Sequence, residues 1–400
     1  IALSPPSPKA CDLERLNHDR GHHPDRDRST LGRLSMSAPA IPTVDLDDLR
    51  SNDPARLETA CASLREAFGV YGLVYVKGHG VDQEAVGRVF DGFRAITKLP
   101  PDEKERLARR AEWYQRGWTP PNTETAVAGG GQPDFKECYF AAPYDSDPEI
   151  AAQYPEIFCA NVWPETIPNA ETWRREYIEM GRALHEAGNE LLRGAARALG
   201  LEPGVFVDVC EGGAHVTRIL HYLALKPDQI DKGILWGEEH TDFNLLTLLP
   251  GGRFVSPEGK TAPKPDDKSG LFLRTRGTPE NPAGVQVRGR PPEGCIVAQI
   301  GQQLEILTGG RFVATPHVIT APGVAGWARD SAAHFVHANP NRILYPLKPF
   351  LGLEERKNYG PPVLAGTYAL KTLVDIGLAP KSTIEKLGYR HYDRLEAQRR

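Results

Sequence analysis

The stretch Gly237–Pro250, with the sequence GEEHTDFNLLTLLP, places a histidine and an aspartate one residue apart, at His240 and Asp242. On an extended segment, residues i and i+2 point to the same face. An imidazole and a carboxylate would therefore approach one point, with the apolar run Leu245–Leu249 behind them. One more imidazole would complete the set of two histidines and one carboxylate that binds Fe(II) on one face and leaves other positions open. His317, in the run GGRFVATPHVI, is the candidate.

A His-x-Asp pair alone is weak evidence, because the chain contains a second one at His23-Pro24-Asp25. That pair lies in the first forty residues, which are rich in Pro, Ser, His, Arg and Asp and poor in apolar residues. Such a composition cannot bury a core, so we expect residues 1–40 to be a disordered extension outside the fold. Met36, followed by Ser-Ala-Pro, resembles a natural start, and residues 1–35 are expected to be dispensable.

The overall composition is that of a globular protein, with 40% hydrophobic and 25% charged residues in a chain of 400. A net charge of −4 argues against a general binder of nucleic acid or of anionic membranes. No apolar run is long enough to span a bilayer. The six cysteines include no CxxC pair, so neither a zinc ribbon nor a disulfide framework is indicated. We therefore expect a cytoplasmic protein with no nucleic-acid or membrane partner.

The first half of the chain after residue 40 is predicted to be largely helical. Asp53 and Pro54 supply an N-cap and a proline in the first turn, and apolar residues then recur at helical spacing as far as Phe68. The expected elements are a helix that ends at Gly69, a strand over Leu73–Lys77, a helix that stops at Pro100, a strand over Glu137–Ala141, and a long helix from Ala170 to Leu199 closed by Gly200.

From Val216 onward the pattern changes to short strands separated by turn residues, which favours an antiparallel sandwich or barrel. The expected strands are Val216–Ala224, Leu245–Leu249, Leu271–Arg274, Val285–Arg288, Cys295–Ile300, Val313–Thr315 and Ser331–Val336. The tail returns to helix, with a capping box at Ser382 and Glu385. We expect a mixed α and β fold in one domain over residues 41–400: a helical part (41–215), a β core (216–345) and a helical tail (346–400).

Several blocks occur in an order that resembles the isopenicillin-N-synthase-like branch of the iron(II)/2-oxoglutarate-dependent oxygenases. The blocks are Ile41-Pro-x-Val-Asp, Gly78-His79-Gly80, Arg116-Gly-Trp-Thr119, Asp134-x-Lys-Glu137, His240-Thr-Asp242, Ile300-Gly-Gln-x-Leu-Glu305 and Pro316-His317. The resemblance covers roughly residues 41–350. It implies a double-stranded β-helix (jelly-roll) core flanked by N- and C-terminal helices, with His240, Asp242 and His317 as the ligands of Fe(II).

The resemblance also implies a site for the cosubstrate 2-oxoglutarate. In this family an Arg-x-Ser pair, here Arg329 and Ser331, follows the distal histidine and holds the far carboxylate of 2-oxoglutarate. A guanidinium suits this role, because it binds a carboxylate with two hydrogen bonds and does not lose its charge. Tyr222 occupies a position from which a family tyrosine often donates to the same carboxylate. A surface ion pair between Arg329 and Asp330 is the alternative interpretation of this arginine.

The function implied is that of a non-haem dioxygenase that uses Fe(II), 2-oxoglutarate and O₂ to hydroxylate or desaturate a small organic molecule, with release of succinate and CO₂. Because Asp242 is a carboxylate and not Ala or Gly, halogenation is not expected. No obligate protein partner is evident. The alternatives are an O₂-using oxidase or cyclase of the same fold that needs no 2-oxoglutarate, a zinc hydrolase with the same ligand set, and a catalytically silent jelly-roll binding protein.

The substrate is not identified by the sequence, and the candidates for its pocket are few. Phe243 and Phe335 are expected to line the pocket or to pack in the core. His334 and His337 flank a strand end, where either could touch a substrate or pack. The polar segment 256–284 is expected to be a lid or an exposed loop.

A chain that begins at Met36 is expected to melt within about 2 °C of the full chain, because residues 1–35 have too few apolar residues to bury against the domain. Differential scanning calorimetry of the two chains measures this difference. A melting temperature lower by about 10 °C would show that the segment packs on the domain.

Overall fold

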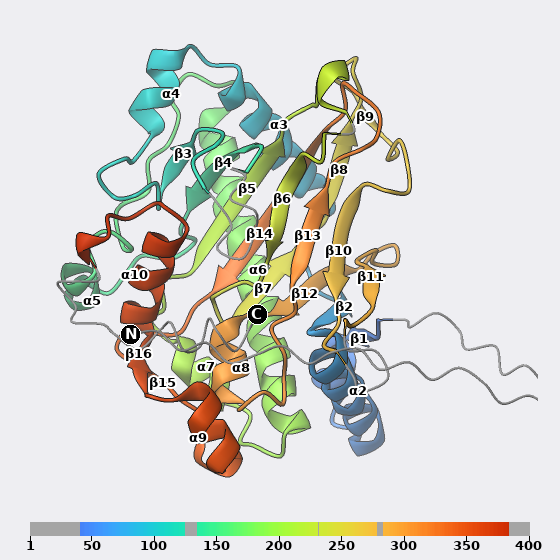
Figure 1. Cartoon of the computed structure of the whole chain (residues 1–400), viewed down its shortest axis with the longest axis vertical. Coiled ribbons are helices and arrows are strands. Elements are labelled where there is room, and N and C mark those ends of the chain that lie inside the picture. Colours follow the sequence, from blue (N-terminus) through green and yellow to red (C-terminus); the bar gives the residue numbers. More distant parts are fainter. Residues whose placement is uncertain (1–40, 125–133, 231, 278–282, 384–400) are drawn as a thin grey trace, which may run out of the picture. The chain divides into compact units, whose positions relative to one another are not determined.

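Two β-sheets pack face to face in the computed structural model, which describes residues 41–124, 134–230, 232–277 and 283–383 (Figure 1). The major sheet runs in the order β1 (Thr43–Asp45), β2 (Leu73–Lys77), β12 (Ile296–Ile300), β7 (Leu246–Leu249), β14 (Ala328–Val336), β5 (Val216–Tyr222), β4 (Lys136–Ala141) and β3 (Gly117–Thr119). Strand β8 (Gly252–Val255) also pairs with β14, and β9 (Thr261–Ala262) pairs with β8. All these pairings are antiparallel except that of β1 with β2.

The minor sheet is antiparallel and supplies the second face. Its order is β11 (Gln286–Arg288), β10 (Gly270–Arg274), β13 (His317–Thr320) and β6 (Leu235–His240). A separate two-stranded sheet joins β15 (Ile343–Leu344) to β16 (Val363–Leu364). Two facing sheets of mostly antiparallel strands confirm the predicted jelly-roll core, and β1 to β4 extend it with strands that precede residue 216.

The space between the two sheets is filled by apolar side chains from both. This interior cluster includes Leu73, Leu220, Tyr222, Trp236, Leu271, Leu273, Val297 and Ile319. Trp236 is fully buried and stacks on Tyr222, with ring centres 5.4 Å apart. Burial of such large rings is the main contribution that holds one sheet against the other.

Helices cover the outer face of the major sheet. The long helix α6 (Ala170–Ala198) lies against β7 and β14, where a Cβ on Gly188 would lie 3.0 Å from Leu248 and 3.3 Å from Val336 (Figure 1). The other helices are α1 (Leu46–Leu49), α2 (Pro54–Glu66), α3 (Gln83–Thr97), α4 (Pro101–Leu107), α5 (Pro148–Gln153), α7 (Val205–Cys210), α8 (Gln302–Leu307), α9 (Leu353–Tyr359) and α10 (Ala365–Asp375).

The helix that was predicted to end at Gly69 continues to Gly72. After α2 the chain forms a π-helical turn over Ala67–Tyr71, which contains Gly69. Gly72 then has a φ of +63°, and a Cβ there would lie 2.2 Å from the carbonyl oxygen of Val313. A side chain has no room at this position, so the left-handed turn and the close approach both require glycine.

The strand that was predicted over Val313–Thr315 is absent, and β13 begins at His317 instead. The first amide of that segment donates to the carbonyl oxygen of Phe68 at 3.0 Å, and the second to the carboxylate of Glu305 at 2.7 Å. These amides are therefore not available to a strand ladder. Pro316 carries no N–H to donate either.

The other predicted elements are confirmed with ends that differ by at most three residues. Strand β6 was not predicted, because its sequence LWGEEH lacks a regular alternation of apolar and polar residues. Strands β3, β8, β9, β13, β15 and β16 are short and were also missed. The capping box at Ser382 and Glu385 extends beyond the described residues.

The polar segment 256–284 contains part of the minor sheet. It carries β9 and β10, and β10 lies between β11 and β13. Residues 278–282 lie outside the described ranges. The segment is therefore anchored by strand pairing on both sides of β10, which neither a separate lid nor a plain exposed loop would show.

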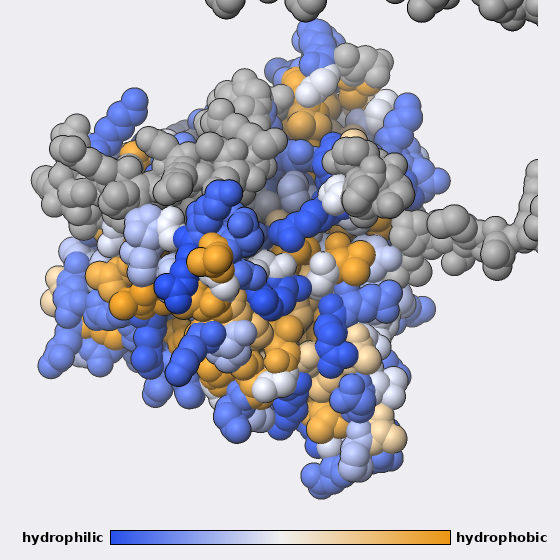
Figure 2. Space-filling model, turned by 60° about the horizontal axis from the view of Figure 1, so that its bottom comes forward, coloured by the Kyte–Doolittle hydropathy of each residue, from blue (hydrophilic) through white to orange (hydrophobic). Residues whose placement is uncertain are grey.

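The C-terminal elements expose apolar side chains. Ile343 on β15 is 60% exposed, Leu353 on α9 is 85% exposed and Leu364 on β16 is 41% exposed. With the bottom of Figure 1 turned forward, apolar and charged side chains are interspersed on the visible face (Figure 2). Within the described ranges, no helix has both the length and the apolar character needed to cross a membrane.

Three histidines lie together between α6 and the major sheet: His185 and His334 are buried, and His215 is partly buried. His185 Nδ1 lies 3.2 Å from His334 Nε2, and the rings of His185 and His215 are centred 4.3 Å apart. Burial lowers the pKa of all three, and the neighbouring histidines lower the pKa of His215 and His334 further. In the folded protein these imidazoles are therefore neutral near pH 7.

This cluster predicts a loss of stability in acid. An unfolded histidine takes up a proton near pH 6.5, whereas the buried ones do so only at lower pH. Below about pH 6.5 the unfolded state binds more protons than the folded state, so the free energy of unfolding decreases as the pH falls. We expect the melting temperature to fall between about pH 7.5 and pH 5.5, with a shallower slope in His334→Gln. Equal slopes for the two proteins would contradict this assignment.

Candidate metal centre and active-site cavity

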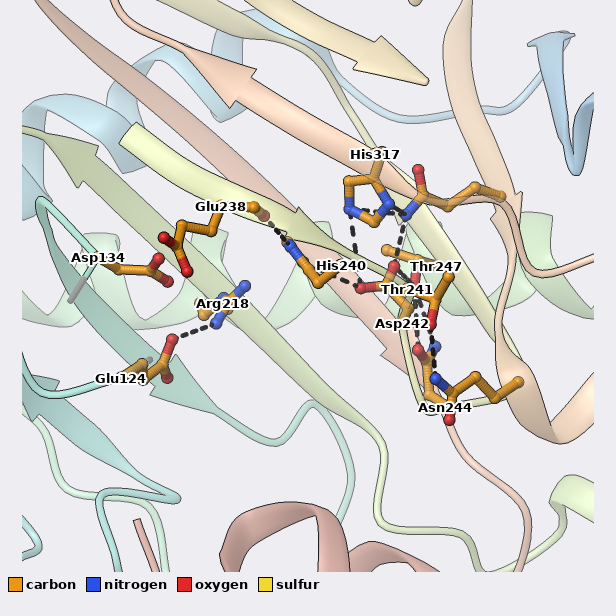
Figure 3. A network of polar contacts seen from close by, with 12 residues as sticks. Glu124, Asp134, Arg218, Glu238, His240, Thr241, Asp242, Asn244, Thr247 and His317 are labelled. Atoms are coloured by element: carbon orange, nitrogen blue, oxygen red, sulfur yellow. Dashed lines mark hydrogen bonds and ion pairs between the residues drawn. The ribbon is translucent and has the colours of Figure 1, made fainter. Parts of the chain in front are cut away.

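His240, Asp242 and His317 lie together beside one end of the minor sheet (Figure 3). His240 is the last residue of β6 and His317 is the first of β13, and they are directly opposite one another in the ladder. Asp242 lies in the loop beyond β6 and not on the strand itself. The structure thus brings the three predicted residues together, although the premise that Asp242 lies on an extended strand is wrong. One potential ligand atom from each residue lies within 4.8 Å of the others.

Two hydrogen bonds fix the orientation of the Asp242 carboxylate. The hydroxyl of Thr247 donates to Asp242 Oδ2 at 2.7 Å, and Gln299 Nε2 donates to the same oxygen at 2.6 Å. The other oxygen, Oδ1, lies 3.8 Å from His240 Nε2 and 4.0 Å from His317 Nε2. One carboxylate oxygen is therefore held by the protein, and the other faces the two imidazoles.

Both imidazoles present Nε2 to this point. His240 Nδ1 lies 2.7 Å from the carbonyl oxygen of Glu238, to which it donates, so the lone pair of its Nε2 faces Asp242. His317 Nδ1 lies 3.4 Å from the carbonyl oxygen of Thr315. Because a backbone carbonyl oxygen lies beside Nδ1 of each ring, the proton is on Nδ1, and Nε2 has the free lone pair that a metal ligand needs.

The electrostatics of the group agree with metal binding. Burial opposes the charged form of Asp242, but His317, His240 and the two hydrogen bonds hold the pKa of its carboxyl below the ordinary value. Burial and the neighbouring His240 lower the pKa of His317 to about 4. A charged carboxylate and a neutral imidazole are the states in which these side chains bind a divalent metal. The donor set of two nitrogens and one oxygen on one face fits Fe(II).

A cavity of about 540 Å³ opens beside the three residues and is lined by His240 and Asp242. Phe243 and Phe335, for which lining of the pocket and packing in the core were both expected, line this cavity, and Phe243 also packs against the core. His337 reaches the cavity, whereas His334 is buried behind the sheet with His185. Other lining residues come from the end of β10, from α8 and from α10.

A cluster of buried charges forms the wall of the cavity next to His240 (Figure 3). Arg218 Nη1 lies 3.1 Å from Glu124, Lys136 Nζ lies 3.3 Å from the same carboxylate, and Lys136 also pairs with Asp134. Burial opposes the charged form of Glu124, but Lys136 and Arg218 hold its pKa below the ordinary value. The cluster is charge-balanced, since it contains two cations and two anions.

Arg329 and Tyr222 lie in the interior between the two sheets, directly opposite one another in the β14–β5 ladder. The guanidinium carbon of Arg329 is 5.4 Å from the centre of the Tyr222 ring. Among the described residues Arg329 Nη1 is buried without a hydrogen-bond partner. A buried donor of a charged group that lacks a partner is costly, and a carboxylate would satisfy it. This orphaned nitrogen fits the far carboxylate of 2-oxoglutarate.

Asp330 points to the opposite face of β14, away from Arg329. Its carboxylate lies 2.7 Å from His221 Nδ1 and 3.0 Å from Arg253 Nε. The alternative of a surface ion pair between Arg329 and Asp330 is therefore wrong. Ser331 alternates back to the side of Arg329, and its hydroxyl donates to the carbonyl oxygen of Gly251 at 3.5 Å.

Several residues that shape the site were missed in the sequence. Thr247 is a lone hydroxyl in the apolar run Leu246–Leu249, and Gln299 is a lone amide in β12, so each could have been noted as a polar residue at a buried position. Glu124 and Arg218 carry no such signal, because their pairing depends on the fold, whereas their partners Asp134 and Lys136 belong to one of the blocks that carry the resemblance.

Comparison with known proteins places this site in a family. A family model described as non-haem dioxygenase in morphine synthesis N-terminal matches residues 41–166. The 2-oxoglutarate-Fe(II) type oxidoreductase hxnY of Emericella nidulans is 24% identical over 332 residues, which cover 82% of this chain and 87% of that protein. A 2OG-Fe(II) oxygenase family protein of Caulobacter crescentus has a similar structure, with a TM-score of 0.66, 25% identity, and coverage of 85% of this chain and 100% of that chain.

These matches confirm the resemblance to the iron(II)/2-oxoglutarate-dependent oxygenases of the isopenicillin-N-synthase-like family. The fold agrees with that of a full-length Neurospora crassa protein solved in complex with alpha-KG, at a TM-score of 0.67 and 21% identity over 84% of this chain and 96% of that chain. Oxygenases of this kind use Fe(II), 2-oxoglutarate and O₂, and the cluster of His240, Asp242 and His317 offers a site for the metal. The zinc-hydrolase and silent-binding alternatives therefore no longer apply.

The ligand assignment can be tested by removing each imidazole from the oxygenase. We expect His240→Ala and His317→Ala each to lose most of the bound iron, because two remaining ligands hold a divalent metal weakly. Elemental analysis of protein reconstituted with Fe(II) measures this. His79→Ala is a matched control, because His79 contacts the Val81 amide and the Gly294 carbonyl oxygen instead of the cluster. Full iron occupancy in either ligand variant would show that the assignment is wrong.

Proposed function

We propose that this oxygenase oxidises a C–H bond of a small organic molecule bound in the cavity beside His240 and Asp242, by hydroxylation in the first instance and by desaturation otherwise. The supporting observation is the cavity itself. Its volume of about 540 Å³ is within the range of small-molecule sites. It also contains two of the three candidate metal ligands, so a molecule in it would lie next to the metal.

When bound, Fe(II) and 2-oxoglutarate supply the oxidising chemistry, in which O₂ converts 2-oxoglutarate to succinate and CO₂ and the substrate C–H bond is oxidised. His240, Asp242 and His317 would hold the metal through Nε2, Oδ1 and Nε2. Arg329 would hold the far carboxylate of 2-oxoglutarate, with Tyr222 and Ser331 beside it. The role of the protein is to place the substrate and to exclude other reductants.

The lining of the cavity suits an organic molecule with both apolar and polar parts. Phe140, Phe243 and Phe335 offer aromatic surface, and α10 adds Leu373 and Ile376. Relatives of the same fold have been solved with small molecules: the Neurospora crassa protein with thymine, and JOX2 with 2OG, Fe and JA. These likenesses support a small-molecule substrate without naming it.

A substrate screen tests the proposal. Purified oxygenase with Fe(II), 2-oxoglutarate and O₂ is incubated with a library of small organic compounds, and succinate is measured. A true substrate raises succinate formation in step with a product that gains one oxygen atom or loses two hydrogens by mass spectrometry. Compounds that are consumed without any succinate would contradict the use of 2-oxoglutarate as cosubstrate.

The role of Arg329 predicts a selective loss of 2-oxoglutarate binding. Removing one partner of a buried, hydrogen-bonded charge pair costs on the order of 2–5 kcal/mol. We therefore expect Arg329→Ala to raise the apparent constant for 2-oxoglutarate by at least about 30-fold. Arg329→Lys should recover part of this loss, because a point charge cannot replace the planar fork. Ser331→Ala and Tyr222→Phe should each cost about 1 kcal/mol.

Iron content should be unchanged in Arg329→Ala, because no proposed metal ligand is touched. Arg253→Ala is a matched control, since Arg253 faces Asp330 and Asp91 on the other side of the sheet. Its constant for 2-oxoglutarate should stay within about threefold of the unmodified value. Turnover that is indifferent to 2-oxoglutarate in the unmodified protein would refute the assignment.

A further inference from the structure

Arg116 is a buried cation that the proposed chemistry leaves without a role. It lies immediately before β3, is 3% exposed and lines the cavity beside the candidate metal ligands. Its Nη1 donates to the carbonyl oxygen of its own neighbour Gln115 at 2.7 Å. Its Nε is buried without any hydrogen-bond partner in the described part of the chain. Burial lowers the pKa of its guanidinium.

The other charged residues that line the cavity have counter-charges. Glu124 and Asp134 pair with Lys136 and Arg218, Glu239 pairs with Arg274, Glu305 with Arg276, Asp375 with Lys371, and Asp242 faces the two imidazoles. Within the described ranges, no carboxylate lies at ion-pair distance from Arg116. Arg116 is therefore the one cation lining the cavity that has no carboxylate partner among the described residues.

Arg116 lines the same cavity as two of the candidate metal ligands, His240 and Asp242. His337 also lines the cavity, and its ring centre is 5.2 Å from that of Phe243, which follows Asp242 in the chain. Burial lowers the pKa of His337 to about 4, while Asp242 raises it and Arg116 lowers it. Arg116, His337, His240 and Asp242 all line this one cavity, so a molecule bound in it would have both the candidate metal site and Arg116 in its walls.

We propose that Arg116 binds a carboxylate of the substrate, so that the small molecules oxidised by this enzyme are organic acids. This inference rests on the proposed function, because it assigns a substrate class to the same cavity. The planar guanidinium matches a carboxylate in shape and charge. A phosphate would bring a charge of about −1.5 to −2 against a single uncompensated cation. The aromatic and aliphatic lining suits the remaining, apolar part of such an acid.

A purely structural role for Arg116 explains these observations less well. A structural arginine is expected to bridge elements through several hydrogen bonds, and buried charges are ordinarily paired. Arg116 instead bonds to the adjacent residue, so its side-chain hydrogen bonds join no two elements of the described fold. A residue that binds a ligand has this arrangement in the unliganded protein, where its unpaired buried charge lowers the stability of the fold.

Binding of matched acids and amides tests the proposal. The probes are 3-phenylpropanoate and octanoate, each beside its primary amide, titrated calorimetrically into enzyme loaded with Fe(II) and 2-oxoglutarate without O₂. We expect at least one acid to bind more tightly than its amide. In Arg116→Gln, affinity for that acid should fall at least about 30-fold, while affinity for the amide stays within about threefold. Arg274→Gln, which removes a lining cation already paired with Glu239, should keep the preference.

Three results would overturn the assignment: acids that bind no better than amides in the unmodified enzyme, an unchanged preference in Arg116→Gln, or an equal loss in Arg274→Gln. Iron content and 2-oxoglutarate affinity, measured in the same samples, separate this inference from the proposed function. If Arg116→Gln has normal iron content and normal affinity for 2-oxoglutarate but still prefers the acid to its amide, only the proposed role of Arg116 is refuted. If the unmodified enzyme binds neither iron nor 2-oxoglutarate, the proposed function falls with it.

The melting temperature gives a second readout that needs no ligand. Replacing an uncompensated buried charge by an apolar side chain of similar length removes a destabilising group. Arg116→Met should therefore melt at the same temperature as the unmodified enzyme or up to about 4 °C higher. A lower melting temperature would assign Arg116 a structural role and overturn the proposal.

Discussion

The register between β6 and β13 is the constraint on which the metal site depends. It sets His240 directly opposite His317, so two imidazoles that are far apart in sequence reach one point. Side chains alternate between the faces of a strand, so a slip of one residue would send one imidazole to the other face. The register is held from both sides: β13 also pairs with β10, and the fully buried Trp236 of β6 stacks on Tyr222 across the interior. The packing of the core therefore fixes the geometry of the candidate ligands.

Charge compensation organises the space around this site. Asp242 is buried, which opposes its charge, yet the imidazoles and two hydrogen bonds keep its carboxyl ionised. The cluster around Glu124 and Lys136 solves the same problem by pairing two cations with two anions. Buried charges are tolerated when they are paired and hydrogen-bonded. Arg116 and Arg329 depart from this pattern, since each has a buried nitrogen without a partner among the described residues. At each of these two arginines a ligand would supply the missing hydrogen-bond partner.

The sequence predicted that the three candidate ligands would lie together, because their signal is local and ordered. His240 and Asp242 stand one residue apart, and the distal His317 follows in a block with a fixed sequence order. The long helix α6 was also readable, since its apolar residues repeat at helical spacing. Strand β6 was not, because Leu235–His240 combines apolar, glycine and acidic residues without alternation. That strand is defined by its pairing with β13, and such pairing cannot be recognised in the amino-acid sequence alone.

Two further failures have the same origin. The helix expected to end at Gly69 continues to Gly72, because the carbonyl oxygen of Val313, distant in sequence, leaves no room for a Cβ there. The strand expected over Val313–Thr315 is absent, because its amides are taken by Phe68 and Glu305. In both cases a tertiary contact overrides a local preference. Local pattern therefore sufficed for long periodic elements and for a spaced motif, whereas element ends and charge pairs depended on the fold.

The candidate metal ligands and the residues proposed to face the substrate are held by different parts of the fold, and this difference affects substrate specificity. The candidate metal ligands stand at the ends of core strands or directly after one, where register fixes them. The residues proposed to face the substrate include some from separate segments around the cavity, such as Arg116 before β3 and Leu373 on α10. Segments outside the core tolerate substitution more readily than the strands they join. A change at Arg116 alters the charge presented to a substrate while the β6–β13 ladder is untouched. The choice of substrate is thus physically separable from the chemistry in this enzyme.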